Sequence, residues 1–198
     1  PTFNRSKQLD NCLNSILISG FNNNNFEVCI SDNNSPDDTK FIVDKYKNKL
    51  NINYSKNSEN IGFARNAINV VKMAKGKYSW ILGDDDLILP HTIDELELIL
   101  RENKDVNFFF VNSFYLDSKY LDDFPKPFDT KKLNIAKLKR LSSQKKNRLV
   151  NYWELINPKV SWEFLIGIFL TVFKTSEWLK ASDRVDKKKL SVKGIWSN

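Results

Sequence analysis

The stretch Tyr78–Pro90, YSWILGDDDLILP, places three consecutive acids between two apolar runs. The apolar residues before the acids predict a buried strand, and the residues after them lead into a helical pattern. Side by side, Asp84, Asp85 and Asp86 repel one another, and such repulsion raises the pKa of neighbouring carboxyl groups. A bound cation relieves the repulsion, so this stretch predicts a cation site at the carboxyl end of a strand.

The residue types favour a hard divalent ion. Mg²⁺ and Mn²⁺ take carboxylate oxygens, and open α/β sheets bind ligands at the carboxyl ends of their strands. The alternative is an ordinary acidic turn that caps the helix after Pro90, because Asp favours helix N-termini and proline the first helical position. A calcium loop of the EF-hand kind fits poorly, because Ile88 and Leu89 stand where an oxygen ligand and the turn glycine are needed.

Strand-like and helical segments alternate along the first part of the chain, with short links between them. The patterns predict helices over about 6–19, 39–49 and 92–101, another that ends near Lys75, and strands over about 26–30, 52–54, 78–82 and 106–115. In the second helix, Phe41, Ile42 and Tyr46 are expected to face inward. This rhythm is typical of an α/β fold with a mostly parallel, doubly wound sheet and helices on both faces. Pro1 and the residues after it read as the exit from a strand, so we expect a further strand upstream.

Composition suits one domain, with a core over 1–116 and a divergent part over 117–198. The chain has 198 residues, a net charge of +7 and two cysteines without metal or redox spacing. The segment 131–148 holds eight Lys or Arg and no acid. Its apolar residues are roughly helically spaced, so it either lies on an anionic membrane surface or forms a solvated helix face or mobile loop. No apolar run is long enough to span a bilayer and no signal peptide is present, which predicts a cytoplasmic protein, peripheral at most to the membrane.

Four stretches carry a family resemblance: Pro1–Arg5 (PTFNR), Asp32–Thr39 (DNNSPDDT), Asn60–Asn66 (NIGFARN) and Ala74–Tyr78 (AKGKY), the last leading into the acids. Together, in this order, they resemble the family 2 glycosyltransferases of the GT-A fold, whose patterns are PTYNR, DDxSxDxT, NxGxxxRN and AxGxY before a metal-binding DxD. The match covers roughly the first 100 residues. The details look most like the subset resembling bacterial abequosyltransferases, which build O-antigen or capsular sugars.

The resemblance implies a metal-dependent, inverting transfer of a sugar from a nucleotide-diphosphate donor to a glycan or lipid-linked glycan acceptor. It implies Mn²⁺ or Mg²⁺ as cofactor, held by Asp85 and by Asp86 as a second ligand or helix cap. The residues that it places around the donor are Pro1, Thr2, Phe3, Arg5, Asp32, Asn34, Gly62, Arg65 and Asp84.

Several donor-site roles follow from the same resemblance. Thr2 and Phe3 are expected to flank the base, and Asp32 to accept the N3–H of a uracil-type base. The guanidinium groups of Arg5 and Arg65 are expected near the diphosphate, because arginine matches phosphate geometry. Asp84 is expected to approach the ribose.

Three features depart from the family. Arg65 stands one position earlier than the arginine of many members. Gly83 stands where many members have the first acid of DxD, and the second half lacks the Glu-Asp pair that often supplies the catalytic base. An inverting transferase needs a carboxylate to take the acceptor's proton. Glu163, between two aromatic residues, is the first candidate for this base. The other acids of the second half that could serve are Glu177, Asp183 and Asp186.

The sequence also bears on two other function classes, a sugar nucleotidylyltransferase and a catalytically degenerate domain. A sugar nucleotidylyltransferase would have a glycine-rich phosphate loop after the first strand, and Asn4–Lys7 has no glycine. A catalytically degenerate domain that only binds the nucleotide sugar stays open as the alternative. No basic-aromatic motif of a nucleic-acid-binding module is present, so no nucleic-acid partner is expected.

Overall fold

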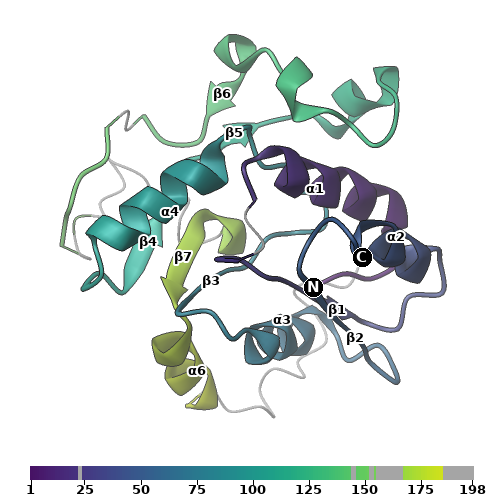
Figure 1. Ribbon diagram of the computed structural model, residues 1–198, viewed down its shortest axis with the longest axis horizontal. Coiled ribbons are helices and arrows are strands. Elements are labelled where there is room, and N and C mark those ends of the chain that lie inside the picture. Colours follow the sequence, from purple (N-terminus) through teal and green to yellow (C-terminus); the bar gives the residue numbers. More distant parts are fainter. Residues whose placement is uncertain (22–23, 144–145, 152–153, 155–166, 185–198) are drawn as a thin grey trace.

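The computed structural model describes residues 1–21, 24–143, 146–151, 154 and 167–184 (Figure 1). Helices and strands alternate up to β4, as the periodicity predicts. The main elements are α1 (Ser6–Ile18), β1 (Val28–Asp32), α2 (Thr39–Tyr46), β2 (Ile52–Lys56), α3 (Phe63–Met73), β3 (Tyr78–Trp80), α4 (Thr92–Glu102), β4 (Phe108–Phe110), β5 (Phe114–Tyr115), β6 (Lys139–Arg140), β7 (Thr171–Lys174) and α6 (Thr175–Asp183).

Apart from the small pair of β5 with β6, the described strands form two groups side by side. β1 and β2 pair in parallel, from Val28 opposite Ile52 to Asp32 opposite Lys56. In the second group β7 lies between β3 and β4 and runs antiparallel to both, so β3 and β4 point the same way. A strand from the C-terminal part of the chain therefore completes a sheet that the N-terminal part begins.

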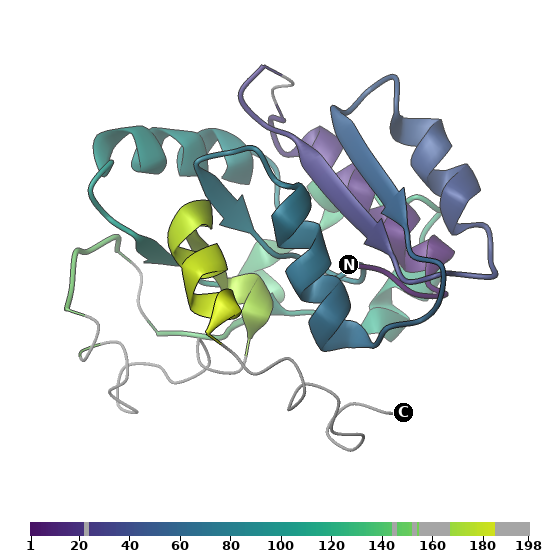
Figure 2. The ribbon, with the colours of Figure 1, turned by 90° about the horizontal axis from the view of Figure 1, so that it is seen from below.

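Helices cover both faces of these strands. Figure 2 shows α3 and α6 in front of the strands, with α1 behind β1. One apolar core joins α1, α2, β1 and the start of α4, with Leu13 and Val43 fully enclosed. A second core joins α3 to β7 through Val71 and Phe173, and Trp178 of α6 stacks on Phe173. The layers are those of an α/β fold.

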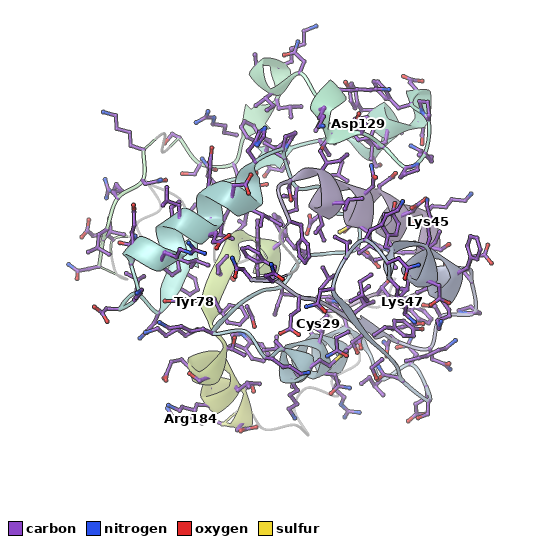
Figure 3. All side chains as sticks on the ribbon, viewed as in Figure 1. Cys29, Lys45, Lys47, Tyr78, Asp129 and Arg184 are labelled. Atoms are coloured by element: carbon purple, nitrogen blue, oxygen red, sulfur yellow. The ribbon has the colours of Figure 1, made fainter. Side chains whose placement is uncertain are left out.

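A cavity of about 480 Å³ separates the two strand groups. Its walls include residues of β1 on one side and of β3 on the other, among them Cys29 and Tyr78 (Figure 3). Pro1 and Thr2 lie at its margin, and Thr2 forms a parallel bridge with Asp32 at the end of β1.

Three local expectations are wrong. The predicted strand over 106–115 is two short strands, because β4 pairs with β7 while β5 turns away to pair with β6. Phe41 is 70 % exposed rather than inward, since α2 turns Thr39, Val43 and Tyr46 toward the core. The described residues of 131–148 form no α-helix; they contain short 3-10 turns and β6.

The sequence also predicts a short helix over 152–156, and this segment lies outside the described residues except for position 154. Among the helices that the structure does describe, none combines the length and apolar character needed to cross a bilayer.

Candidate active site

The N-terminal segment lies against the end of β1. The Thr2 amide donates to the Ser31 carbonyl oxygen at 3.0 Å, and the Asn33 amide donates to the Thr2 carbonyl oxygen at 2.9 Å. Asn4, whose φ is 54°, donates its amide to the hydroxyl of Ser35. Backbone hydrogen bonds thus fix the first motif beside the second, at the carboxyl end of the parallel pair.

The same segment reaches the acidic turn. The Thr2 hydroxyl donates a 2.7 Å hydrogen bond to Oδ2 of Asp84, and Nη1 of Arg5 lies 3.3 Å from Oδ1 of the same carboxylate. Asp84 is only 9 % exposed. Burial raises the pKa of Asp84 above its usual value, while the Thr2 hydroxyl and the Arg5 charge oppose the rise. Asp84 is therefore held in place rather than free to swing toward solvent.

Asp85 is the accessible member of the three acids. Its side chain is 57 % exposed, and its Oδ2 accepts a 2.7 Å hydrogen bond from Nη1 of Arg5. The guanidinium of Arg5, itself 49 % exposed, thus bridges two adjacent carboxylates through one nitrogen. Because both partners are exposed, this ion pair contributes little to folding stability and can be exchanged for another partner.

Asp86 folds back over its own turn. The Gly83 amide donates to Oδ2 of Asp86 at 2.6 Å, and the Asp86 amide donates to the Gly83 carbonyl oxygen. Burial raises the pKa of Asp86 to about 6, against the effect of the Gly83 amide, and repulsion from Asp85 and Asp84 adds to the rise. Asp86 is thus a partly buried carboxyl close to two other acids, which makes it a candidate functional group.

Gly83 makes this arrangement possible. A Cβ at this position would stand 2.8 Å from Oδ1 of Asp85 and 2.9 Å from Oδ2 of Asp86, closer than side chains pack. Two carboxylate oxygens therefore converge on the space that the glycine leaves open.

This convergence fits Mg²⁺ or Mn²⁺. Both ions accept one or two protein carboxylates, with phosphate oxygens and water in the other positions. Asp85 and Asp86 would hold the ion. Within the described ranges, no group of three His, Cys, Asp or Glu side chains forms a complete metal site.

Helix α1 contacts the acidic turn and the residues just after it. The Ile88 amide, just after the acids, donates to the hydroxyl of Ser15 at 2.9 Å, and the Cys12 thiol lies 3.7 Å from the Gly83 carbonyl oxygen. Burial raises the pKa of the Cys12 thiol far above its ordinary value. Cys12 is therefore an inert packing residue, as the sequence indicates.

Asp32 has a different environment from the one expected. Its side chain is fully buried; Oδ1 accepts the Ser35 amide and Oδ2 accepts the Tyr54 hydroxyl, both at 2.8 Å. In this conformation Asp32 shapes the turn after β1, and a direct hydrogen bond to a base would require one of its oxygens to be uncovered.

A buried amide network joins the second and third motifs. Oδ1 of Asn66 accepts the Ser31 hydroxyl and the Asn57 amide group, and Nδ2 of Asn66 donates to the Ser31 carbonyl oxygen. Asn33 donates to the side chain of Asn60 and accepts the Asn57 amide group. Sequence reasoning singled out the motif but missed this network. Its long-range contacts depend on the fold, because Asn33 lies 24 and 27 positions before its asparagine partners and Ser31 lies 35 positions before Asn66.

Asp37 fixes the start of two helices at once. One of its oxygens accepts the Ser6 amide at 2.8 Å, and the other accepts the amide and hydroxyl of Thr39. Ser6 begins α1 and Thr39 begins α2. The acid of the DxT pattern is thus structural here, and it ties the loop after β1 to the first motif.

The remaining predicted donor residues lie at the surface near these loops. Phe3 is 42 % exposed, and Asn34 is exposed with φ of 68°. Gly62 has φ of 81° at the start of α3, with open space where a Cβ would stand. Arg65 is exposed on the first turn of α3, and no contact among the described residues joins it to the acidic turn.

The candidate base, Glu163, lies outside the described residues, as does Asp186. Two of the alternative acids are on α6. Glu177 is exposed and pairs with Lys180 at 2.9 Å, and this hydrogen bond lowers the pKa of Glu177, which makes it a weaker base. Asp183 is exposed at the end of the same helix, which packs on α3.

Comparisons with known proteins indicate the family of this chain. The family "Glycosyl transferase family 2" matches residues 1–154. Abequosyltransferase RfbV of Salmonella typhimurium is 39 % identical over 108 residues, which are 54 % of this chain and 32 % of that protein. Poly(ribitol-phosphate) beta-N-acetylglucosaminyltransferase TarS of Staphylococcus aureus is 35 % identical over 104 residues, 52 % of this chain and 18 % of the relative. The matches thus span less than a third of either relative.

The fold comparison covers more of the chain. The crystal structure of S. aureus TarS 1–349 in complex with UDP superposes with a TM-score of 0.70, covering 98 % of this chain and 50 % of that one at 21 % identity. This likeness confirms the predicted GT-A α/β fold, and the abequosyltransferase match confirms the predicted resemblance. The chain belongs to glycosyl transferase family 2.

Proposed function

We propose that this chain carries the donor site of a metal-dependent, inverting glycosyltransferase. The transfer runs from a nucleotide-diphosphate sugar to a glycan or lipid-linked glycan acceptor in cell-surface polysaccharide synthesis. The observation that carries the proposal is the meeting of the first motif with the acidic turn, through Thr2 on Asp84 and Arg5 on Asp84 and Asp85. Residues 82 positions apart are thereby held in one polar cluster at the carboxyl end of β1 and β3.

Each part of this cluster has a role that its geometry supports. The exposed ring of Phe3 offers a face on which a base can stack, and Asn34 and Gly62 lie on the neighbouring loops. Arg5 presents a half-exposed guanidinium suited to phosphate oxygens, and Arg65 is a second candidate on α3. Asp84, held by Thr2, is proposed to face the ribose.

Asp85 and Asp86 are proposed to hold Mn²⁺ or Mg²⁺. When bound, the ion would offset the charge of the leaving diphosphate. The raised pKa of Asp86 and the convergence of the two carboxylates beside Gly83 support this assignment. The proton of the acceptor hydroxyl is assigned to a carboxylate of the second half of the chain, with Glu163 as the sequence-based candidate.

The basic segment is proposed to contact an anionic membrane surface on the cytoplasmic side. Its lysines 131, 132, 137 and 139 are exposed, and the side chain of Ile135 beside them is 41 % exposed. Basic residues interleaved with exposed apolar side chains favour the surface of anionic lipids. A lipid-linked acceptor would be presented at the same surface.

The test is calorimetric titration of the chain with UDP, CDP, GDP and dTDP, each with and without Mn²⁺. UDP comes first because the TarS structure of similar fold holds UDP. We expect one nucleotide to bind in a metal-dependent way, and Asp85→Asn to abolish the metal dependence. Asp105→Asn, at an exposed acid before β4, is the matched control. A folded sample that binds none of the four nucleotides would contradict the proposal, whereas a sample that binds a nucleotide but transfers no sugar would favour the catalytically degenerate domain.

A further inference from the structure

The guanidinium of Arg5 already places a positive charge beside the acidic turn. Nη1 of Arg5 lies 2.7 Å from Asp85 and 3.3 Å from Asp84, and it reaches the same Asp85 carboxylate that is the accessible candidate for a metal. A divalent ion and this guanidinium therefore compete for one group. Arg5 can therefore affect the binding of the metal as well as the binding of phosphate.

We propose that Arg5 is the resident counter-ion of the acidic turn and makes metal binding depend on the donor's diphosphate. The proposal rests on the proposed function and adds the order in which the partners are accepted. Without nucleotide, Arg5 neutralises Asp85 and repels a second cation. With nucleotide, the guanidinium turns from Asp85 to the diphosphate and leaves the carboxylate to the ion.

The exposure of the pair makes this exchange feasible. Asp85 is 57 % and Arg5 49 % exposed, so both are hydrated and their attraction is screened. Asp84, by contrast, is 9 % exposed and is held by the Thr2 hydroxyl as well. Arg5 can therefore leave Asp85 without freeing Asp84, and the cluster keeps its shape.

The guanidinium also has donors to spare. Both of its ion pairs with the described residues use Nη1, whereas a guanidinium carries five N–H donors in a planar fork. The other edge of the fork matches two phosphate oxygens in the bidentate manner that arginine favours. A single residue can thus pass from carboxylate to diphosphate by a small rotation.

Charge balance gives the sign of the effect. Asp84, Asp85 and Asp86 carry three negative charges when ionised and Arg5 one positive charge, so a divalent ion added alone only brings the cluster to neutrality, whereas without Arg5 the same ion would leave it negative. A diphosphate adds negative charge and so favours retention of the ion beside Arg5. Since binding linkage is reciprocal, nucleotide must raise metal affinity by the same factor as metal raises nucleotide affinity.

The test measures Mn²⁺ binding by electron paramagnetic resonance of the free ion, with and without UDP, in the unaltered chain, Arg5→Gln and Arg5→Lys. For Arg5→Gln without nucleotide we expect Mn²⁺ affinity to rise about tenfold, because a like charge is removed from a site near the surface. We expect the gain from adding UDP to shrink by a similar factor. Arg5→Lys keeps the charge and should hold Mn²⁺ affinity near that of the unaltered chain.

Arg101→Gln is the control, since Arg101 also pairs with a carboxylate, Glu97, but on the exposed face of α4. Unchanged or weaker Mn²⁺ binding by folded Arg5→Gln without nucleotide would overturn the inference. If Arg5→Gln does not fold, Arg5→Lys decides: tight Mn²⁺ binding without nucleotide despite the retained charge would overturn it as well. If calorimetry selects another nucleotide, that nucleotide replaces UDP. The metal-only arm needs no nucleotide, so a failure of all four nucleotides to bind would count against the proposed function and not against the counter-ion.

Discussion

The hydroxyl of Thr2 donates a 2.7 Å hydrogen bond to Asp84, which lies 82 positions later in the chain. The contact joins the first motif to the acidic turn and is buried on both sides, since Thr2 is 3 % and Asp84 9 % exposed. It satisfies a carboxylate whose burial alone raises its pKa. The acidic turn is therefore shaped by the N-terminal segment as well as by its own sequence.

Thr2→Val should destabilise the fold by about 1–3 kcal/mol, because it leaves a buried carboxylate oxygen without its donor. Thr2→Ser keeps the hydroxyl and is the matched control. Urea unfolding followed by tryptophan fluorescence measures both. Equal free energies of unfolding for the two variants would show that the hydrogen bond does not stabilise the turn.

Asn66→Ala should cost about 1–3 kcal/mol, because Ser31 and Asn57 lose buried hydrogen-bond partners. Asn69→Ala, on the same helix and half-buried, is the control and should cost less than half as much. The same urea experiment compares them. A cost for Asn69→Ala as large as that for Asn66→Ala would assign the effect to helix α3 in general and not to the network.

Asp37→Asn tests the double cap and its pH dependence. Hydrogen bonds from Ser6 and Thr39 lower the pKa of Asp37 in spite of partial burial. A lowered folded-state pKa contributes stability that is present above the unfolded value, near about 3.9, and is lost as pH falls through the folded value. We expect Asp37→Asn to be less stable by about 1 kcal/mol at pH 7 and the difference to shrink at pH 3. A difference that stays constant from pH 7 to pH 3 would contradict this account.

The basic segment, residues 131–148, is expected to bind surfaces that contain anionic lipid. Replacing Lys131, Lys132 and Lys137 by glutamine should weaken binding to vesicles that contain anionic lipid roughly hundredfold, at about 1 kcal/mol per lysine. Co-sedimentation with phosphatidylglycerol vesicles measures it, with phosphatidylcholine vesicles for comparison. The control replaces three exposed lysines elsewhere, Lys7, Lys72 and Lys104. An equal loss in the control would indicate a general charge effect and no membrane face.

Periodicity and turn chemistry predicted the regular elements of the first half. The helices α1, α3 and α4 lie where apolar spacing places them, because each covers a sheet face with one apolar stripe. The pairing of strands that lie far apart in the sequence could not be predicted. The insertion of β7 between β3 and β4 depends on a return of the chain that no local pattern encodes, and the same return divides the predicted strand over 106–115.

The sequence predicted only the local part of the candidate site. The acids and the glycine of the turn are adjacent in sequence, so their cluster could be read directly. The contacts of Thr2 and Arg5 with the acids, and the burial of Asp32 by Tyr54, arise only when distant segments meet. The helical reading of 131–148 was wrong because lysine-rich spacing alone does not supply an apolar face that packs.

The central claim is that a metal–nucleotide complex binds at the acidic turn, and paramagnetic broadening of amide signals locates that complex most directly. Substoichiometric Mn²⁺ would be added with the nucleotide that calorimetry selects to ¹⁵N-labelled chain, and with nucleotide alone as reference. We predict that the signals of Gly83, Asp84, Asp85 and Asp86 disappear first, followed by those of Thr2 and Arg5. Broadening centred on another acidic region, such as Asp117–Asp123, or spread evenly over the surface, would contradict the account.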